Sequence, residues 1–271
     1  MNCVIRWCGV ALLLAVCSAR AQQLPLWELG VFGGAAATPA YPGAAQRSTR
    51  ALVLPFLIYR GDVVRVDQQG IGARLLRSER TEFDVGLAAS LPAKSSDVPA
   101  REGMPDLGLL FELGPRLKVT LARPTSGSRF RLDLPLRAVI EARSGMRAQG
   151  WTFEPRIVYE ANAPGERWTF DANLGMVFGD PKVNRYFYEV RPEFATPQRP
   201  AFEADSGLML LRAGASASRM LGNDLRLFGY VRHESYAGAA NRDSPLMQKR
   251  SGASAGFAFA WTITRSAQAA R

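Results

Sequence analysis

The single histidine of the chain, His233, stands in Arg232-His233-Glu234-Ser235, where a base and a nucleophile occupy alternate positions. Residues two apart in a strand point to the same face, so His233 and Ser235 share one face and Glu234 takes the other. A serine activated by a histidine attacks esters, with a carboxylate holding the histidine ring. Asp243 is the next carboxylate along the chain. The pattern permits ester hydrolysis, and the plainer interpretation is a polar residue at the rim of a sheet.

The segment that carries this pair determines which face the two side chains would occupy. By parity, His233 and Ser235 fall with Leu225, Leu227 and Val231 on the apolar face. A lipid hydrolase needs its reactive groups on such a face. The pair is similar to the histidine and serine of outer-membrane lipid A deacylases, which also lie on a barrel strand followed by a turn of small residues.

Alternation with a period of two runs through most of the chain. Between Arg129 and Arg137, even-numbered positions are apolar and odd-numbered ones are charged or proline. The segments 82–91, 151–160 and 168–178 alternate in the same way, as strands with one apolar and one polar face do. Such runs cover about 9–11 residues, the length that a tilted strand needs to cross hydrocarbon. Soluble sandwiches also alternate, but their strands usually cover about five or six residues.

We therefore predict an all-β fold, an antiparallel transmembrane β-barrel of about 12 strands, with roughly 10–14 possible. An even count follows if both termini are periplasmic. The segments 62–77 and 184–194 are ambiguous, since the first fits one long or two short strands. The candidate strands are 27–36, 49–58, 62–77, 80–91, 106–113, 116–123, 129–141, 150–160, 167–178, 206–217, 223–235 and 251–263.

The connections between these strands are of two kinds, as in barrels with short periplasmic turns and longer external loops. Tight turns are expected at 59–62, 78–80, 114–116 and 221–224. Long polar loops are expected at 38–48, 93–105, 180–205 and 237–250.

A sheet in hydrocarbon must close, because each unpaired backbone group there costs several kcal/mol. The polar face then lines the interior, where charges of both signs pair and fill the lumen, or else line a small aqueous path. The size of the barrel favours paired filling. The interior charges are Glu82, Asp84, Lys118, Arg131, Asp133, Arg137, Glu154, Arg156, Glu160, Asp171, Arg226, Arg232 and Glu234.

The first residues are typical of a secretory signal peptide. A charged start to Arg6, an apolar run over 8–16 and the small residues around Ala21 predict cleavage after Ala21, which leaves a barrel domain of residues 22–271. The alternative is lipoprotein processing at Cys17. All three cysteines lie in this leader, so the mature chain has no disulfide and no thiolate metal site.

Charge and the remaining acids bear on ligands. Without Arg6 and Arg20, 32 basic residues face 24 acidic ones, a net charge of +8. For an exported protein, this charge favours outer-membrane lipid headgroups and lipopolysaccharide phosphates over nucleic acid. The acids of 93–106 and 180–184 do not have the spacing of a calcium loop. We expect no metal and no cofactor.

Several motifs, in order, resemble the MipA/OmpV family of outer-membrane proteins, also described as MltA-interacting or murein-hydrolase-scaffolding proteins. The resemblance covers nearly all of the mature chain, and no single motif decides it. The matching segments are 25–30 (PLWELG), 54–62 (LPFLIYRGD), 100–107 (AREGMPDL), 112–115 (ELGP), 195–201 (ATPQRPA) and 243–246 (DSPL).

The resemblance implies an outer-membrane barrel without catalytic residues and, for the named member, a scaffold that joins a lytic transglycosylase to a penicillin-binding protein. Other members look like adhesins, porin-like proteins or stress-responsive envelope proteins. We therefore expect a non-enzymatic scaffold for murein-remodelling enzymes. A small-solute channel is the first alternative, and a lipid hydrolase using His233, Ser235 and Asp243 is the second. This chain departs from the family at its end, where a polar tail of 265–271 follows a last strand that should stop near Ile263.

Overall fold

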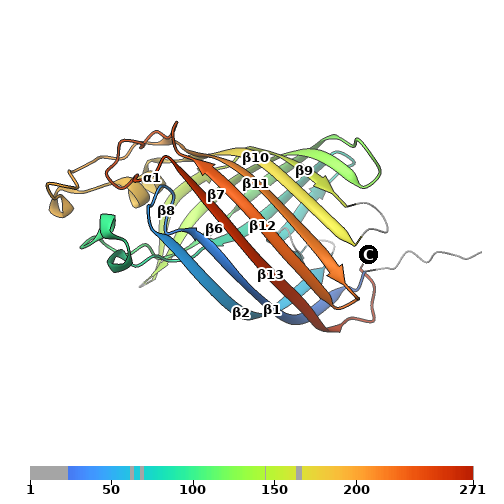
Figure 1. The fold of residues 1–271 in the computed structure, drawn as a ribbon. Helices are drawn as coiled ribbons and strands as arrows, with labels where there is room; N and C mark the ends of the chain where they lie inside the picture. The colour runs from blue at the N-terminus through green and yellow to red at the C-terminus, as the bar shows by residue number, and fades with distance from the viewer. Residues whose placement is uncertain (1–23, 62–63, 68–69, 144, 163–166, 271) are drawn as a thin grey trace, which may run out of the picture.

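The strands of this protein form one closed antiparallel sheet. The computed structural model describes residues 24–61, 64–67, 70–143, 145–162 and 167–270, and the expected leader lies outside them. Within these ranges, thirteen strands form a single sheet. The first strand, β1 (Trp27–Pro39), pairs with the last, β13 (Ser251–Arg265), so no edge is left at the seam. Figure 1 shows the resulting barrel of strongly tilted strands.

Between β1 and β13 the chain runs as a meander in which each strand pairs with the next, except that β8 does not pair with β9. The intervening strands are β2 (Arg47–Arg60), β3 (Val64–Asp67), β4 (Gly70–Arg77), β5 (Thr81–Ser90), β6 (Leu109–Ala122), β7 (Ser128–Arg143), β8 (Gly145–Phe153), β9 (Arg156–Ala161), β10 (Trp168–Gly179), β11 (Gly207–Leu221) and β12 (Leu225–Ser235).

Strands β8 and β9 are two halves of one barrel strand, since β7 pairs with both of them and so does β10. The break falls at Glu154 and Pro155, where proline has no N–H to donate to the sheet. Thirteen assigned strands therefore make twelve barrel strands, and the predicted barrel and its strand count are confirmed.

The ambiguous segment 62–77 contains two short strands, β3 and β4, which is one of its two expected forms. One expected strand boundary is wrong. The expected turn at 114–116 lies inside β6, which continues from 109 to 122. Position 114 requires glycine, because a Cβ atom there would lie 2.0 Å from the carbonyl oxygen of Leu136 on β7. Close strand approach, rather than a turn, explains this glycine.

The faces of the strands follow the predicted alternation, with apolar side chains outside and charges inside. Leu174, Trp168 and Phe257 are exposed on the outer surface, whereas Asp133 and Arg131 are buried. The exposed apolar side chains form a belt around the sheet, and the first and last strands pair at the seam. A lipid bilayer requires this arrangement of a β-sheet.

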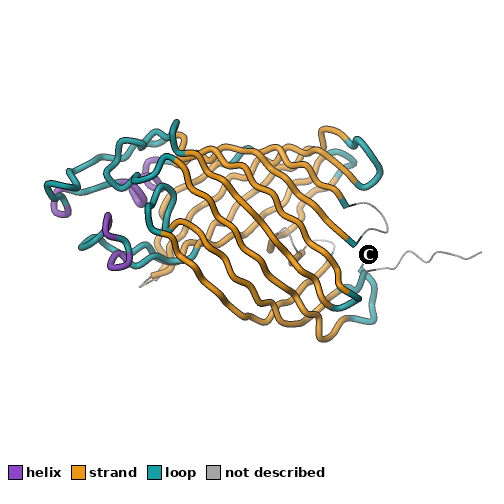
Figure 2. Tube along the Cα trace, viewed as in Figure 1, coloured by secondary structure: helices purple, strands orange, loops and turns teal. Residues whose placement is uncertain are grey.

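The two ends of the barrel differ, as Figure 2 shows. Short turns and the two ends of the described chain, Leu24 and Ala270, lie at one end, and we assign it to the periplasm. The expected turns at 78–80 and 221–224 are found there, and so are the end of β2 and the start of β3. The expected turn at 59–62 extends to Asp62, which lies outside the described residues. The C-terminal tail is not free: Pro25 pairs with Ala269, and Leu26 N donates to Gln268 O at 2.8 Å. The last strand itself continues to Arg265, two residues beyond the expected Ile263.

The opposite, external end carries the long loops, 40–46, 91–108, 180–206 and 236–250, which we call the external cap. The sequence predicted polar loops, but these pack together around buried side chains, including Tyr188 and Leu246, both 0% exposed. The ambiguous segment 184–194 is not a strand: it contains the end of α1 (Pro181–Tyr188) and the turn η3 (Pro192–Phe194). No helix in the described ranges is long and apolar enough to cross a membrane.

Candidate functional site: the barrel lumen

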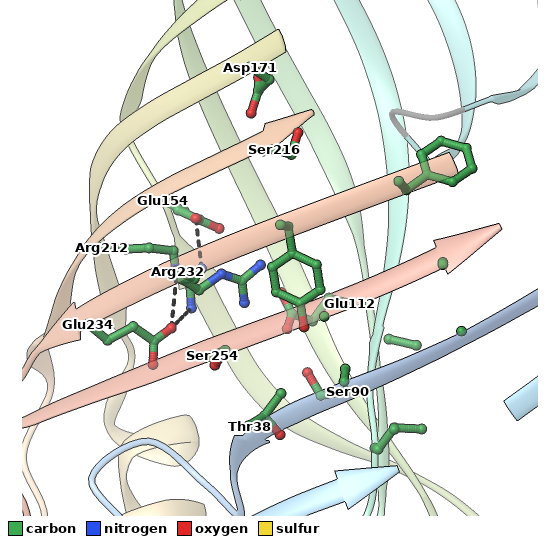
Figure 3. A pocket seen from close by; sticks show the side chains of 18 of the residues that line it. Thr38, Ser90, Glu112, Glu154, Asp171, Arg212, Ser216, Arg232, Glu234 and Ser254 are labelled. Carbon is green, nitrogen blue, oxygen red and sulfur yellow. Dashed lines mark hydrogen bonds and ion pairs between the residues drawn. The ribbon is translucent and has the colours of Figure 1, made fainter. Parts of the chain in front are cut away.

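The lumen is the main interior space of the barrel, and charged side chains from β5 to β12 line one side of it. Figure 3 shows Arg212 of β11 between two carboxylates. Its Nη1 lies 2.8 Å from Glu154 Oε1, and its Nη2 lies 2.9 Å from Glu234 Oε1. Glu234 also accepts a hydrogen bond of 2.8 Å from Tyr236 OH. One arginine thus joins the β8–β9 break to β12 across the wall.

Two further groups of ion pairs continue this charged wall toward the periplasm. Asp133, 0% exposed, accepts from Arg131 Nε at 2.6 Å and lies 3.3 Å from Arg156 Nη2. Asp84 binds Arg116 through two hydrogen bonds of 2.8 and 2.9 Å. Buried carboxylates are tolerated because each has a cationic partner. The predicted pairing of lumenal charges is confirmed for most of the residues named, whereas Asp171, Arg226 and Arg232 form no ion pair among the described residues.

The ion pairs do not fill the lumen completely. A cavity of about 1180 Å³ remains, and side chains of the external cap, including Tyr41, Leu107, Val183 and Phe187, line it as well as the barrel wall. The folded cap therefore covers the external end of the cavity.

The other side of the lumen is apolar, which the sequence analysis missed. Register places Phe228, Ala258, Gly34 and Leu52 in one row across β12, β13, β1 and β2. The next row toward the periplasm is Arg226, Ala260, Phe32 and Leu54, so its charge is confined to the β12 end. Phe56 follows on β2. The sequence does indicate this apolar side, because residues 51–58 are all apolar and do not alternate in polarity.

A polar row lies nearer the external cap, where Arg232 of β12 pairs with Ser254 of β13, and Thr38 of β1 pairs with Ser48 of β2. One row separates it from the apolar rows, and that row contains Tyr230, Gly256, Ala36 and Arg50. Arg50 lies two residues from Ser48 on the same face of β2. Its guanidinium donates hydrogen bonds to Ser48 Oγ and to the carbonyl oxygen of Pro92.

Arg232 projects into the cavity over Ser254 (Figure 3) and contacts the ring of Tyr230, with its Cζ 5.9 Å from the centroid. Among the described residues, neither Arg232 nor Arg50 forms an ion pair with a carboxylate. These two lumenal arginines therefore carry positive charge that the wall does not neutralise.

The structure places His233 and Ser235 on the outer face of β12, opposite Glu234, as parity predicted. Asp243 lies in the external cap with a side chain that is 76% exposed, and Arg242 Nε is 3.6 Å from its Oδ2. Within the described ranges, no hydrogen bond joins His233 to Ser235 or to Asp243. The three residues share the external end but are not assembled, and their catalytic role stays a prediction.

The acids that could have indicated calcium have local structural roles. Asp180 caps α1, since its Oδ1 accepts from Val183 N at 2.9 Å. Asp106 accepts from Ser95 N at 2.7 Å, and this hydrogen bond lowers its pKa. Over the described residues, no group of three or more His, Cys, Asp or Glu side chains is placed to hold a metal ion.

Comparison with known proteins gives distant structural likeness and one family. No curated protein matches the sequence. The NanC porin is 8% identical and matches 87% of this chain and all of its own, with a TM-score of 0.41. A bacterial polysaccharide outer-membrane secretin is 8% identical over 89% of this chain and 99% of its own, with a TM-score of 0.42. The TodX monoaromatic hydrocarbon channel is 10% identical over 88% and 90%, with a TM-score of 0.35.

These scores are low, and the fold rests on the strand pairing itself. The sequence match identifies the family to which the chain is related. The family described as MltA-interacting protein MipA matches residues 31–263, from the first strand to the last. This range includes the barrel wall, the apolar side of the lumen and the whole external cap. The chain is an outer-membrane β-barrel protein and belongs to the MipA family.

Proposed function

We propose that this protein is a non-enzymatic barrel that holds a murein-remodelling enzyme, a lytic transglycosylase, at the periplasmic side of the outer membrane. The observation that carries the proposal is the family match over residues 31–263, since the family is described by its interaction with such an enzyme. A penicillin-binding protein is a second partner of the same scaffold. The unassembled His233, Ser235 and Asp243 are consistent with a binding role.

The periplasmic end offers a surface for this partner. Its exposed charges are mostly positive: the exposed acids described near the turns are Glu79 and Asp224, and six exposed arginines outnumber them. We call these arginines the periplasmic rim. They are Arg77, Arg80, Arg123, Arg167, Arg219 and Arg265. A rim of one sign favours a partner with an acidic patch, and its association should weaken with salt.

Binding of a purified lytic transglycosylase to the barrel in nanodiscs tests the proposal. We expect saturable binding that falls about tenfold or more when Arg80→Glu and Arg123→Glu are combined. The matched control is Arg191→Glu in the external cap, where the side chain is 53% exposed. Failure of the folded wild-type barrel to bind any such enzyme would contradict the scaffold, and equal loss in the control would contradict the rim.

A small-solute channel remains the first alternative, because the lumen holds a cavity of about 1180 Å³. The external cap counts against an open axial pore. Planar-bilayer recordings separate the two functions: discrete conductance steps support a channel, and a silent folded barrel removes it. For the lipid hydrolase, release of acyl chains from lipopolysaccharide by the wild type and its loss in His233→Ala would be required.

Two further proposals concern the way the protein enters and sits in the membrane. We expect export through a leader cleaved after Ala21, so N-terminal sequencing of the mature protein should begin at Gln22. We also expect lipid headgroups and lipopolysaccharide phosphates to contact the exposed arginines at the two ends of the barrel.

A further inference from the structure

Strand β2 has a sheet neighbour along only one of its edges over most of its length. It pairs with β1 from Arg47 to Tyr59. With β3 it pairs at Tyr59 and Arg60 alone. Between Arg60 and Thr81 the described strands are β3 and β4, which pair up to Asp67 and Gly70, level with Ile58. Neither of these strands pairs with the part of β2 that precedes Ile58.

On the far side of the hairpin, the pairing of β4 with β5 stops at Leu87, so the end of β5 rises past it. We call the opening between residues 51–58 of β2 and Ala88–Ser90 of β5 the lateral notch. Its external end lies at Arg50, whose guanidinium donates to the carbonyl of Pro92. Among the described strands, none fills it. Pro55, which has no N–H, lies within this free edge, where proline is tolerated.

An unpaired strand edge is costly in hydrocarbon and persists at membrane depth only where it faces protein or a water-filled cavity. Both sides of the lateral notch line the lumenal cavity: Phe56, Leu57 and Ile58 on β2, and Ala89, Ser90 and Leu91 at and beyond the end of β5. The lumen therefore adjoins the bilayer through the wall, while the external cap covers the axial route.

The surfaces beside the lateral notch are ordered by polarity. Nearest the cap lies the polar row, with Arg232, Ser254, Thr38 and Ser48, and with Arg50 next to it. Below it come the apolar rows with Phe228, Leu52, Phe32 and Leu54. Leu54 is 53% exposed although it faces the lumen, so this apolar surface is not covered by other side chains. One end of this surface is therefore cationic and lined by hydroxyls, and the other end is apolar.

We propose that the lumen binds a single-chain anionic amphiphile that enters from the membrane through the lateral notch. The head group, a carboxylate or a phosphate, lies between Arg232 and Arg50 and accepts hydrogen bonds from the hydroxyls of the polar row. The hydrocarbon chain lies on the apolar side along β2, and its end extends through the lateral notch. The site is separate from the periplasmic rim, so it does not depend on the scaffold role.

Photo-crosslinking tests this site in the intact barrel. The full mature chain is placed in phosphatidylcholine nanodiscs with palmitate that carries a diazirine in its chain, and labelled residues are mapped by mass spectrometry. We expect saturable labelling at the lumen-facing Leu52, Leu54 and Phe32 that excess laurate or lysophosphatidylglycerol removes. The better of the two competitors identifies the head group. Excess acetate should not compete, because it has no chain.

Matched variants separate the two halves of the site. Arg232→Ala should raise the palmitate concentration for half-maximal labelling about tenfold, and Arg80→Ala on the periplasmic rim should leave it unchanged. Leu54→Gln should raise it severalfold, whereas Val53→Gln, on the opposite face of β2 and 70% exposed, should not. Heat-modifiable migration confirms that each variant is folded, and Arg232→Gln replaces Arg232→Ala if the latter is not.

Three results would overturn the proposal. Labelling confined to outward-facing residues such as Val53 would show ordinary contact with the bilayer. Competition by acetate would show a simple anion site without a hydrocarbon side. Equal weakening by Arg80→Ala and Arg232→Ala would remove the lumenal arginine from the binding site.

Discussion

Asn241 and Asn184, from different loops of the external cap, are joined by a hydrogen bond of 2.9 Å from Asn241 Nδ2 to Asn184 Oδ1. Both side chains are almost fully buried. Asn241 also accepts from the backbone N–H of Asp205 at 2.9 Å, and Asn184 donates to the carbonyl of Gly179 at 2.9 Å. The pair fixes the loop after β12 to the first turns of α1, directly above the barrel.

Asn241→Ala should therefore loosen the external cap. The change leaves the Asp205 N–H without its acceptor, and a buried unsatisfied group costs about 1–3 kcal/mol. Faster tryptic cleavage after Lys182 and Arg185, which are both exposed in α1, would report the loosening in folded barrels. Asn223→Ala, in the exposed turn between β11 and β12, is the control and should leave cleavage unchanged. Equal cleavage of the wild type and Asn241→Ala would contradict the role of the pair.

Among the carboxylates of the lumen, Asp133 should contribute most to the free energy of unfolding. Its replacement by Ala leaves Arg131 buried without the 2.6 Å hydrogen bond to Asp133, and removing one partner of a buried ion pair costs about 3–5 kcal/mol. Urea unfolding of the barrel in detergent micelles measures this loss. Asp224→Ala serves as control because Asp224 pairs with Arg265 on the periplasmic rim, with a side chain that is 57% exposed, where about 0–1 kcal/mol is expected.

The sequence predicted the barrel well because lipid and lumen impose opposite polarities on alternate residues. Arg131, Leu132 and Asp133 take the faces that parity assigns them. The boundaries were harder to predict. A Gly-Pro pair usually marks a turn, but at 114–115 it marks close approach of β6 to β7, and that depends on a neighbouring strand rather than on local sequence.

The lumenal site was only partly visible in the sequence. Most of the lumenal charges were identified individually, but Arg212, Arg116 and Arg50 were missed. Ion-pair partners depend on register, which links Arg212 to Glu154 over many intervening residues. The apolar side was missed because Leu52 and Leu54 resemble lipid-facing residues when no neighbour is known. The lateral notch depends on the length of one hairpin relative to the strands beside it, which only pairing reveals.

Gly30 should be essential for closing the barrel at the seam. A Cβ at this position would lie 2.0 Å from the carbonyl oxygen of Trp261 on β13, where the backbone has no room to give way. Gly30→Ala should lower the fraction of heat-modifiable, folded barrel by a cost of at least about 1–3 kcal/mol. Gly229→Ala is the matched control, since nothing lies within 4 Å of the added Cβ. Normal folding of Gly30→Ala would show that the seam tolerates displacement.

Alkaline pH should open the external cap. Burial raises the pKa of Tyr41 to about 12, and its hydroxyl donates to Leu246 O at 2.7 Å. The ordinary pKa of tyrosine is about 10. Because the folded pKa is the higher one, the stabilisation is complete below about pH 10 and disappears as pH rises through about 12.

Protease accessibility of the external cap between pH 10 and 12 measures this effect. Tyr41→Phe should reduce the change in protease accessibility with pH. Some change should remain, because burial also raises the pKa of Tyr188 and of Tyr236. Tyr59→Phe, at the other end of the barrel, should behave as the wild type does. A pH profile that Tyr41→Phe leaves unaltered would contradict the role of this tyrosine.

Residues 24–26 pair with residues 268–270, so the strands could be joined in a different sequence order. Pro25 and Ala269 are bridge partners, and Ala270 N donates to Leu24 O at 2.8 Å, so the two ends meet at one point of the periplasmic end. A short linker between them would introduce no strain, and new termini at the exposed turn 222–224 would cut no strand. The barrel is therefore suited to circular permutation, and β12 and β13 followed by β1 would then be made as one continuous unit.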